Sequence, residues 1–312
     1  MSQSKNWLMF GALGLIWGSS FLWIKLALEE IGPFAVVGWR TLFGFLGLLV
    51  ILRLRRIPVP RDPRTLAKFA VMGLLNVAVP WLMITWAETR IASGLAAVLN
   101  GTMPLFTTVI AHFALTDDKI TAGRALGLIV GFIGVVVLVG SDFDVANFLQ
   151  GDLIAELALL GAVVFYAVSV TFQRRYLRGQ NTVLQSTLSL GVGAATVWAV
   201  TPLFQPYQVP TQALTWMAVT WLGLLGSCVA FIMSYGLLNA WGPTRSSLVT
   251  YVFPVVGLIL GAIFLHETLT WRLGIGAVLV IAGIVFVNAR TILAALRPAP
   301  QPSAANARQG GD

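Results

Sequence analysis

Few side chains in this sequence could handle charge inside an apolar environment. Arg40 stands eighth in the apolar stretch 33–52, where a buried cation is costly unless it has a partner. Its guanidinium could bind the carboxylate of a small molecule, or it could tie helix ends together through their carbonyl groups. Glu156 lies one turn into the stretch 153–173 and is either an interfacial carboxylate or a proton carrier.

Lys25 closes the first apolar stretch of the chain. Trp17, Phe21 and Lys25 follow one another at four-residue spacing, which places them on one face of a helix. A lysine in this position either extends its amine to the membrane surface or takes part in a gate contact. Pro104 and Pro254 each remove one backbone hydrogen bond inside a long apolar span, so they indicate either kinks beside a cavity or plain packing.

Uncharged polar and aromatic residues supply the remaining candidates for a binding site. Amide and hydroxyl groups in spans can orient a ligand, although helix–helix hydrogen bonds explain them equally well. Four aromatic residues lie deeper than a membrane-interface belt requires. The predicted substrate-binding residues are Trp17, Ser20, Asn76, Trp81, Asn100, Tyr166, Ser227, Tyr235 and Tyr251.

An enzyme is a poor interpretation of these residues. Cys228 is the single cysteine and has no histidine near it in sequence, and only two histidines occur in the chain. No glycine-rich phosphate loop followed by Lys-Ser/Thr is present, so an ATP-driven mechanism would need another subunit. We therefore predict no catalytic residues, no metal and no cofactor. A carrier that binds a small molecule is the favoured interpretation of these residues. The alternatives are a channel, a lipid scramblase and a membrane-embedded enzyme.

The elements that must position these residues are membrane helices. The chain has 312 residues, of which 57% are hydrophobic and 10% are charged, against about 25% charged in soluble domains. No charged residue occurs from Gly179 to Thr244, a stretch long enough for more than one crossing. We predict an all-α integral membrane protein with ten transmembrane helices near 7–28, 33–52, 67–87, 91–115, 121–140, 152–173, 182–203, 213–238, 244–265 and 271–293.

The distribution of the net charge of +8 along the chain is typical of a membrane protein and does not indicate nucleic-acid binding. If the N-terminus is cytoplasmic, sixteen Lys and Arg residues fall on the inside and three on the outside. This asymmetry predicts that both termini are cytoplasmic. The expected partners are a small-molecule substrate and the lipid bilayer, with no nucleic acid, and the chain is expected to be a monomer or weak dimer. Residues 294–312 are predicted to form a disordered cytosolic tail.

The two halves of the chain resemble each other. A shift of 150 positions places Gly73-Leu74-Leu75 on Gly223-Leu224-Leu225 and Pro104 on Pro254. A shift of 149 places Gly127 on Gly276 and Gly134 on Gly283. Residues 1–150 and 151–293 would then each hold five helices. Because five is odd, the second repeat enters the membrane inverted, which is the architecture of alternating-access transporters.

The motifs resemble those of the drug/metabolite transporter superfamily, EamA family. Trp17-Gly18-Ser19-Ser20-Phe21 before Lys25, and Pro33 before Arg40, are similar to its first two helices. Pro104 followed by Asp118-Lys119-Ile120-Thr121, and Pro254 followed by Glu267-Thr268-Leu269-Thr270, are similar to its repeated pattern. The resemblance implies a multi-pass protein of a cell membrane, the inner membrane in a bacterium. It also implies two inverted five-helix repeats, a central cavity and export of amino acids or related metabolites.

Overall fold

In the computed structural model the chain is built from α-helices interrupted by short π- and 3₁₀-helical turns. The structure describes residues 3–116, 119–139 and 153–289, and the side chains of these residues except 3, 235, 238–239 and 242–247. The α-helices before residue 140 are α1 (Gln3–Gly18), α2 (Ser20–Leu28), α3 (Pro33–Leu54), α4 (Pro63–Gly73), α5 (Val79–Ala87), α6 (Ser93–Gly101), α7 (Met103–Ala114) and α8 (Ala122–Val139). Those after residue 152 are α9 (Leu153–Tyr176), α10 (Thr182–Val200), α11 (Ala213–Thr220), α12 (Ala230–Ser246), α13 (Val252–Phe264) and α14 (Trp271–Val287).

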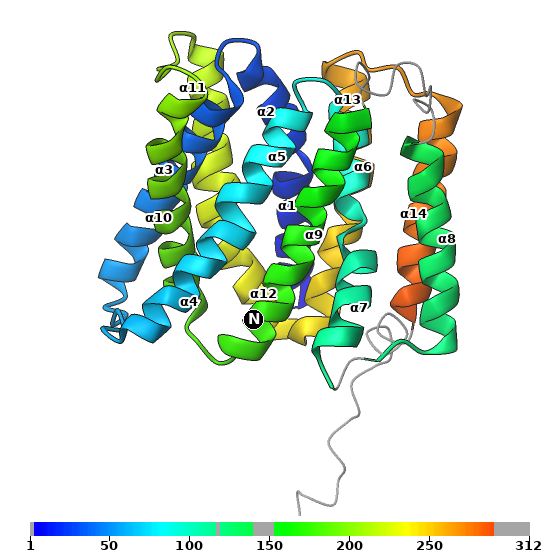
Figure 1. Cartoon of the computed structure of the whole chain (residues 1–312), viewed down its shortest axis with the longest axis horizontal. Coiled ribbons are helices and arrows are strands. Elements are labelled where there is room, and N and C mark those ends of the chain that lie inside the picture. Colours follow the sequence, from blue (N-terminus) through cyan, green and yellow to red (C-terminus); the bar gives the residue numbers. More distant parts are fainter. Residues whose placement is uncertain (1–2, 117–118, 140–152, 290–312) are drawn as a thin grey trace, which may run out of the picture.

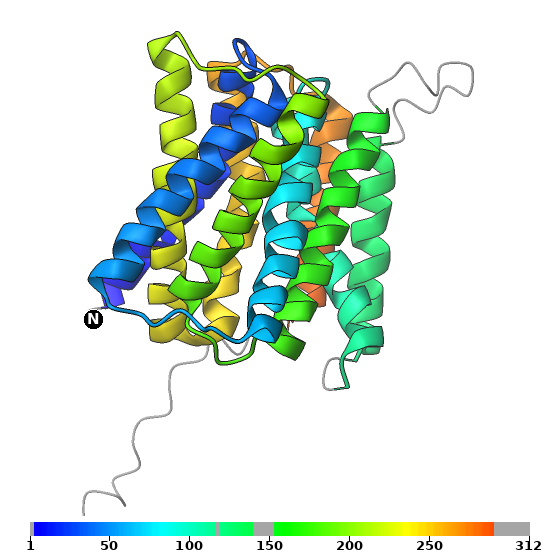
Figure 2. The ribbon, with the colours of Figure 1, turned by 60° about the vertical axis from the view of Figure 1, so that its left-hand side comes forward.

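The helices stand side by side in one bundle, in which α1–α2, α4–α5, α6–α7 and α11–α12 continue in one direction and successive membrane-length segments run in opposite directions (Figures 1 and 2). We call the end of the bundle that holds the N-terminus the proximal end and the opposite end the distal end. The chain first reaches the distal end through α1 and α2 and returns through α3. The distal end therefore carries the connections α2–α3, α5–α6, α10–α11 and α13–α14.

Among the described residues, eight helical segments are long and apolar enough to cross a membrane, and two shorter apolar helices follow them. The eight are Ser4–Leu28, Pro33–Leu54, Pro63–Ala87, Ser93–Ala114, Ala122–Val139, Leu153–Tyr176, Thr182–Leu203 and Ala213–Ser234. The two shorter ones are Leu248–Phe264 and Trp271–Val287. The eight long segments overlap the first eight predicted helices, and the two shorter helices lie within the predicted ranges 244–265 and 271–293. Large apolar side chains such as Leu15, Val50 and Ile133 are exposed, as suits a surface that faces lipid.

Local sequence explains where the helices begin. Asp62 precedes Pro63 and accepts hydrogen bonds from the N–H groups of Arg64 and Thr65, at 3.3 and 3.0 Å. At the start of α10 the side chain of Asn181 accepts from the N–H groups that follow it. These caps satisfy amide groups that a helix leaves without an internal partner.

Breaks within the long helical segments recur at matching places. Leu74–Ala78 forms a π-helical turn between α4 and α5, and Trp221–Val229 forms one between α11 and α12. The shift of 150 places the first turn inside the second. Pro104 is the second residue of α7, directly after the break at Thr102, and Pro254 is the third residue of α13, after a 3₁₀ turn. Pro254 packs against Gly101 of α6.

Helices α8 and α14 pack closely through glycines at one edge of the bundle (Figure 1). A Cβ atom on Gly127 would lie 2.7 Å from the carbonyl oxygen of Gly283, and one on Gly134 would lie 3.0 Å from that of Gly276. The shift of 149 relates Gly127 to Gly276 and Gly134 to Gly283. The two contacts are therefore reciprocal, which is the pattern that two-fold symmetry produces at an interface.

Candidate functional site

Arg40 lies inside the bundle, on α3, and is only 9% exposed. Its guanidinium carbon is 3.8 Å from the centre of the Trp81 ring of α5. The positive charge of Arg40 also interacts electrostatically with Tyr166 of α9 and with Glu88, the residue directly after α5. The Nε atom is buried and has no hydrogen-bond partner among the described residues. A desolvated cation on an aromatic face gains about 2 kcal/mol, and the unpaired Nε leaves a donor for a ligand oxygen.

Neutral polar side chains continue from this cation toward the proximal end. Ser169 donates to the Oδ1 atom of Asn76 at 3.0 Å, and it also donates to the carbonyl of Tyr166 at 2.8 Å. Asn76 lies in the π-helical turn before α5, where the irregular helix brings its amide toward α9. Asn76 is one of the predicted site residues, and in the structure its side chain has a hydrogen-bond partner, Ser169.

A small cavity of about 70 Å³ adjoins Asn76. Its polar lining comes from α9 and α10, where Gln173 donates to Gln185 at 3.2 Å. The buried hydroxyl of Ser189 has no hydrogen-bond partner among the described residues. The cavity is lined by Met72, Asn76, Val77, Gln173, Gln185, Ser186, Ser189, Leu190 and Phe231. Amide and hydroxyl groups dominate its polar surface, so it suits a neutral hydrogen-bonding solute.

Aromatic rings lie on the other side of Phe231. Trp17 packs against Phe231 and Phe253, with ring centres 6.3 and 5.5 Å apart. Its indole N–H donates to the carbonyl of Gly226 at 3.0 Å, in the second π-helical turn. Ser20 is buried nearby and donates to the carbonyl of Ile16 at 3.3 Å. Phe231 thus connects an aromatic region on α1 with the polar cavity beside Asn76.

A charged cluster closes the distal end of this polar region. Lys25 of α2 donates to the carbonyls of Glu88 and Ile91, at 2.7 and 2.8 Å. Glu267, in the α13–α14 connection, accepts from the N–H groups of Ser93 and Gly94, at 2.6 and 2.9 Å. We call Lys25, Glu88, Ile91, Ser93, Gly94 and Glu267 the distal cluster. Glu88 was not among the predicted site residues because it stands in a gap between two apolar stretches and reads as an ordinary loop residue.

Several predicted residues lie away from this group. Ser227 is fully buried, donates to the carbonyl of Leu222 at 2.9 Å and packs against α3. Tyr251 interacts with Asn288 near the end of α14. Asn100 has a buried Oδ1 atom without a hydrogen-bond partner among the described residues. Glu156 is buried in the first turn of α9.

The remaining predictions fall outside the described residues. The side chain of Tyr235 is one of them, as are Asp118 in the motif after Pro104 and the predicted tail 294–312.

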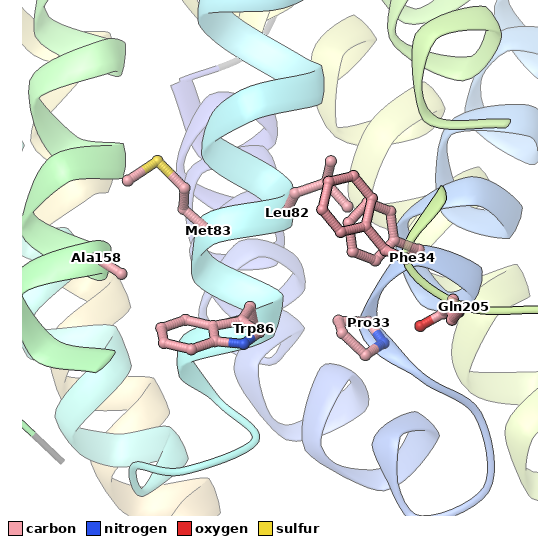
Figure 3. A pocket seen from close by; sticks show the side chains of 8 residues that line it. Pro33, Phe34, Leu82, Met83, Trp86, Ala158 and Gln205 are labelled. Carbon is pink, nitrogen blue, oxygen red and sulfur yellow. The ribbon is translucent and has the colours of Figure 1, made fainter. Parts of the chain in front are cut away.

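An apolar recess lies apart from these polar residues (Figure 3). It measures about 470 Å³ and lies beside α5, with Met83 and Ala158 on one side and Phe34 and Gln205 on the other. Gln205 is its main polar group. Hydrocarbon fits such a lining better than a polar solute does, so we place the candidate site at Arg40, Trp81 and Asn76 instead.

A multi-pass helical bundle with a buried polar region between its helices is typical of membrane transporters. The sequence profile of the EamA-like transporter family matches residues 5–140 and again 153–289. The chain therefore belongs to the EamA-like transporter family and is not an enzyme.

Relatives of the chain are transporters as well. It is 29% identical to the transporter YoaV of Bacillus subtilis over 280 residues, covering 89% of this chain and 94% of the relative. It is 27% identical to the inner membrane transporter YedA of Escherichia coli K12 over 299 residues, covering 94% and 95%. A solved crystal structure with 20% identity superposes with a TM-score of 0.66 and covers 94% of this chain and 99% of the other, which supports the fold.

Proposed function

We propose that this protein is a secondary transporter that exports small neutral or zwitterionic metabolites, with amino acids as the leading class. The observation that carries the proposal is the composition of the candidate site. One buried cation, Arg40, stands against Trp81, and the groups that continue from it are amides and hydroxyls. Such a site can accept a carboxylate at the guanidinium while neutral dipoles hold the rest of a molecule without net charge.

The same composition disfavours phosphorylated substrates. A phosphate carries about two negative charges at neutral pH and loses its hydration when it enters a narrow, buried site. Stabilising a bound phosphate would require several cations close together. The described residues of the candidate site supply one cation, Arg40. The cavity is small, about 70 Å³, which fits a carrier better than an open pore.

Two observations support alternating access by inverted repeats. The family profile matches the chain twice, once in each half. The reciprocal contacts of Gly127 with Gly283 and of Gly134 with Gly276 have the form that a two-fold axis between the halves would create. With ten crossings, the basic residues gather at the proximal end, so we assign this end to the cytoplasm and the distal end to the outside.

Counterflow in proteoliposomes tests the proposal. Purified protein should exchange a radiolabelled amino acid against unlabelled amino acid, and it should not exchange a sugar phosphate. Arg40→Gln should raise the half-saturating concentration about 10- to 100-fold, because a hydrogen bond to a charged group is worth about 1.5–3 kcal/mol.

The matched control is Arg90→Gln. Arg90 also stacks on a tryptophan, Trp86, with its guanidinium carbon 4.9 Å from the ring centre, but it is exposed at the distal end. This variant should exchange amino acids as the unaltered protein does. Equal loss in both variants would refute the assignment of Arg40 to the site. Exchange of sugar phosphates without amino acids would refute the substrate class.

A further inference from the structure

Glu88 has an unusual environment for a carboxylic acid. It directly follows the last residue of the span Pro63–Ala87 and is 0% exposed. Both of its carboxyl oxygens are buried and have no hydrogen-bond partner among the described residues. An ionised carboxylate in that position would have lost its hydration without receiving any donor in exchange.

The neighbouring charged groups are engaged elsewhere. Lys25 approaches from α2, but its amine donates to two backbone carbonyls, one of them that of Glu88 itself. Arg40 approaches from α3 and stacks on Trp81. Glu267 approaches from the α13–α14 connection as a second acid, with its oxygens on the N–H groups that open α6.

These three groups act on Glu88 in opposite directions. Burial raises the pKa of the Glu88 carboxyl well above its usual range, and the negative charge of Glu267 raises it further. Lys25 and Arg40 lower that pKa, but their effect is smaller than that of burial. Burial of both oxygens without a donor therefore favours the protonated form of Glu88 in this conformation.

The surroundings of Glu88 are also the place where distant parts of the chain are joined. Lys25 holds the carbonyl end of α5, and Glu267 holds the amide end of α6, each with the charge that complements that helix end. The α5–α6 turn is thereby clamped between α2 and the α13–α14 connection, which lies far away in sequence. Movement of α2 and the α13–α14 connection away from this turn would break these bonds, and water would then reach Glu88.

We propose that Glu88 is a proton-binding site of the transport cycle, which takes up one proton when the distal end closes and releases it when that end opens. The inference rests on the proposed transport function. On closure an O–H bond forms on a Glu88 carboxyl oxygen with a proton from the solution at the distal end. On opening, that proton returns to the same solution, and the ionised carboxylate gains water and the freed amine of Lys25.

The linkage has a definite sign. The closed form binds one more proton than the open form, so acid at the distal side favours the closed form and alkali favours the open form. Between the pKa of Glu88 in the open form and that in the closed form, each pH unit shifts the ratio of the two forms by about tenfold. Exchange from the distal side should therefore slow as that solution becomes more acidic.

Infrared difference spectroscopy of the reconstituted protein tests the site directly. A pH titration should show the carbonyl band of a protonated carboxylic acid that persists above the usual range of glutamate, and Glu88→Gln should remove it. The matched control, Glu267→Gln, should keep the band and move its midpoint to lower pH, because a repelling charge is lost.

A second measurement needs no variant. A membrane-soluble carbodiimide modifies protonated carboxyl groups, so mass spectrometry should find the label on Glu88 and not on Glu267, with less labelling as the pH rises. A band that survives in Glu88→Gln, or labelling of Glu267 in preference to Glu88, would overturn the proposal. Neither readout involves transport: failure of amino-acid counterflow with the Glu88 band present refutes only the substrate, and counterflow without the band refutes only the proton site.

Discussion

The contact between α8 and α14 predicts a large difference between two glycine substitutions in the same helix. A Cβ atom on Gly283 would run into the backbone of Gly131 and lie 2.7 Å from the carbonyl oxygen of Gly127. These are backbone atoms, so no side chain can turn aside and the helices must separate. Reaching an ordinary contact of about 3.4 Å requires a movement of about 0.7 Å at the Gly127 oxygen and a larger one at the Gly131 backbone, and overpacking of this kind costs about 1–3 kcal/mol.

Gly274 lies in the same helix and has nothing within 4 Å of the place where a Cβ atom would stand. Replacing it with alanine should be neutral or stabilising by up to about 1 kcal/mol, because alanine favours the helix. Gly283→Ala receives the same benefit, so its net loss should be up to about 2 kcal/mol. Unfolding of both variants in mixed micelles, as the fraction of denaturing detergent is raised, measures the difference. Equal stabilities would refute the reciprocal glycine packing.

Two further predictions concern the ends of the bundle. Glu30 accepts hydrogen bonds from Thr211, which lower the pKa of its carboxyl from the usual 4.5 to about 2. The stability that this carboxylate contributes is therefore present above pH 4.5 and is lost as the pH falls toward 2. The stability difference between the unaltered protein and Glu30→Gln should accordingly shrink as the pH is lowered across that range. For topology, single cysteines at Arg61 and Arg272 in a Cys228→Ala background should react differently with an impermeant thiol reagent on intact cells. Label at 272 alone is expected, and label at 61 alone would reverse the assigned orientation.

The helices could be predicted from the sequence because the bilayer imposes a simple rule. Backbone groups in hydrocarbon must be paired within the segment, so a long apolar stretch has to be helical. The stretch 213–238 illustrates the limit of this rule. It is predicted as a helix, and within that helix the structure has the π-helical turn Trp221–Val229. Hydropathy reports length and depth, and it does not report how the hydrogen bonds run along a helix.

The candidate site was harder to predict because it depends on contacts between distant residues. Arg40 and Trp81 stood out by type and depth, and the structure brings them together. Ser227 stood out for the same reason, yet its hydroxyl is satisfied by its own helix. Glu88 carried no signal at all, since a glutamate between two apolar stretches is ordinary in a loop. Only the packing of three other elements over it turns that carboxyl into a buried acid.

The candidate site is asymmetric although the reciprocal glycine contacts are symmetric. Ser169 and Ser20 are 149 positions apart, and each lies beside a π-helical turn of the other half of the chain. Ser169 meets an amide there, Asn76, whereas Ser20 meets Gly226, with the ring of Trp17 beside it. In the proposed alternating-access cycle, a two-fold arrangement would equalise the packing that opens and closes at either end. The proposed zwitterionic substrate, however, has a charged end and a side chain that differs from it. Polar groups at one π-helical turn and an aromatic ring at the other would give such a molecule one preferred orientation between them.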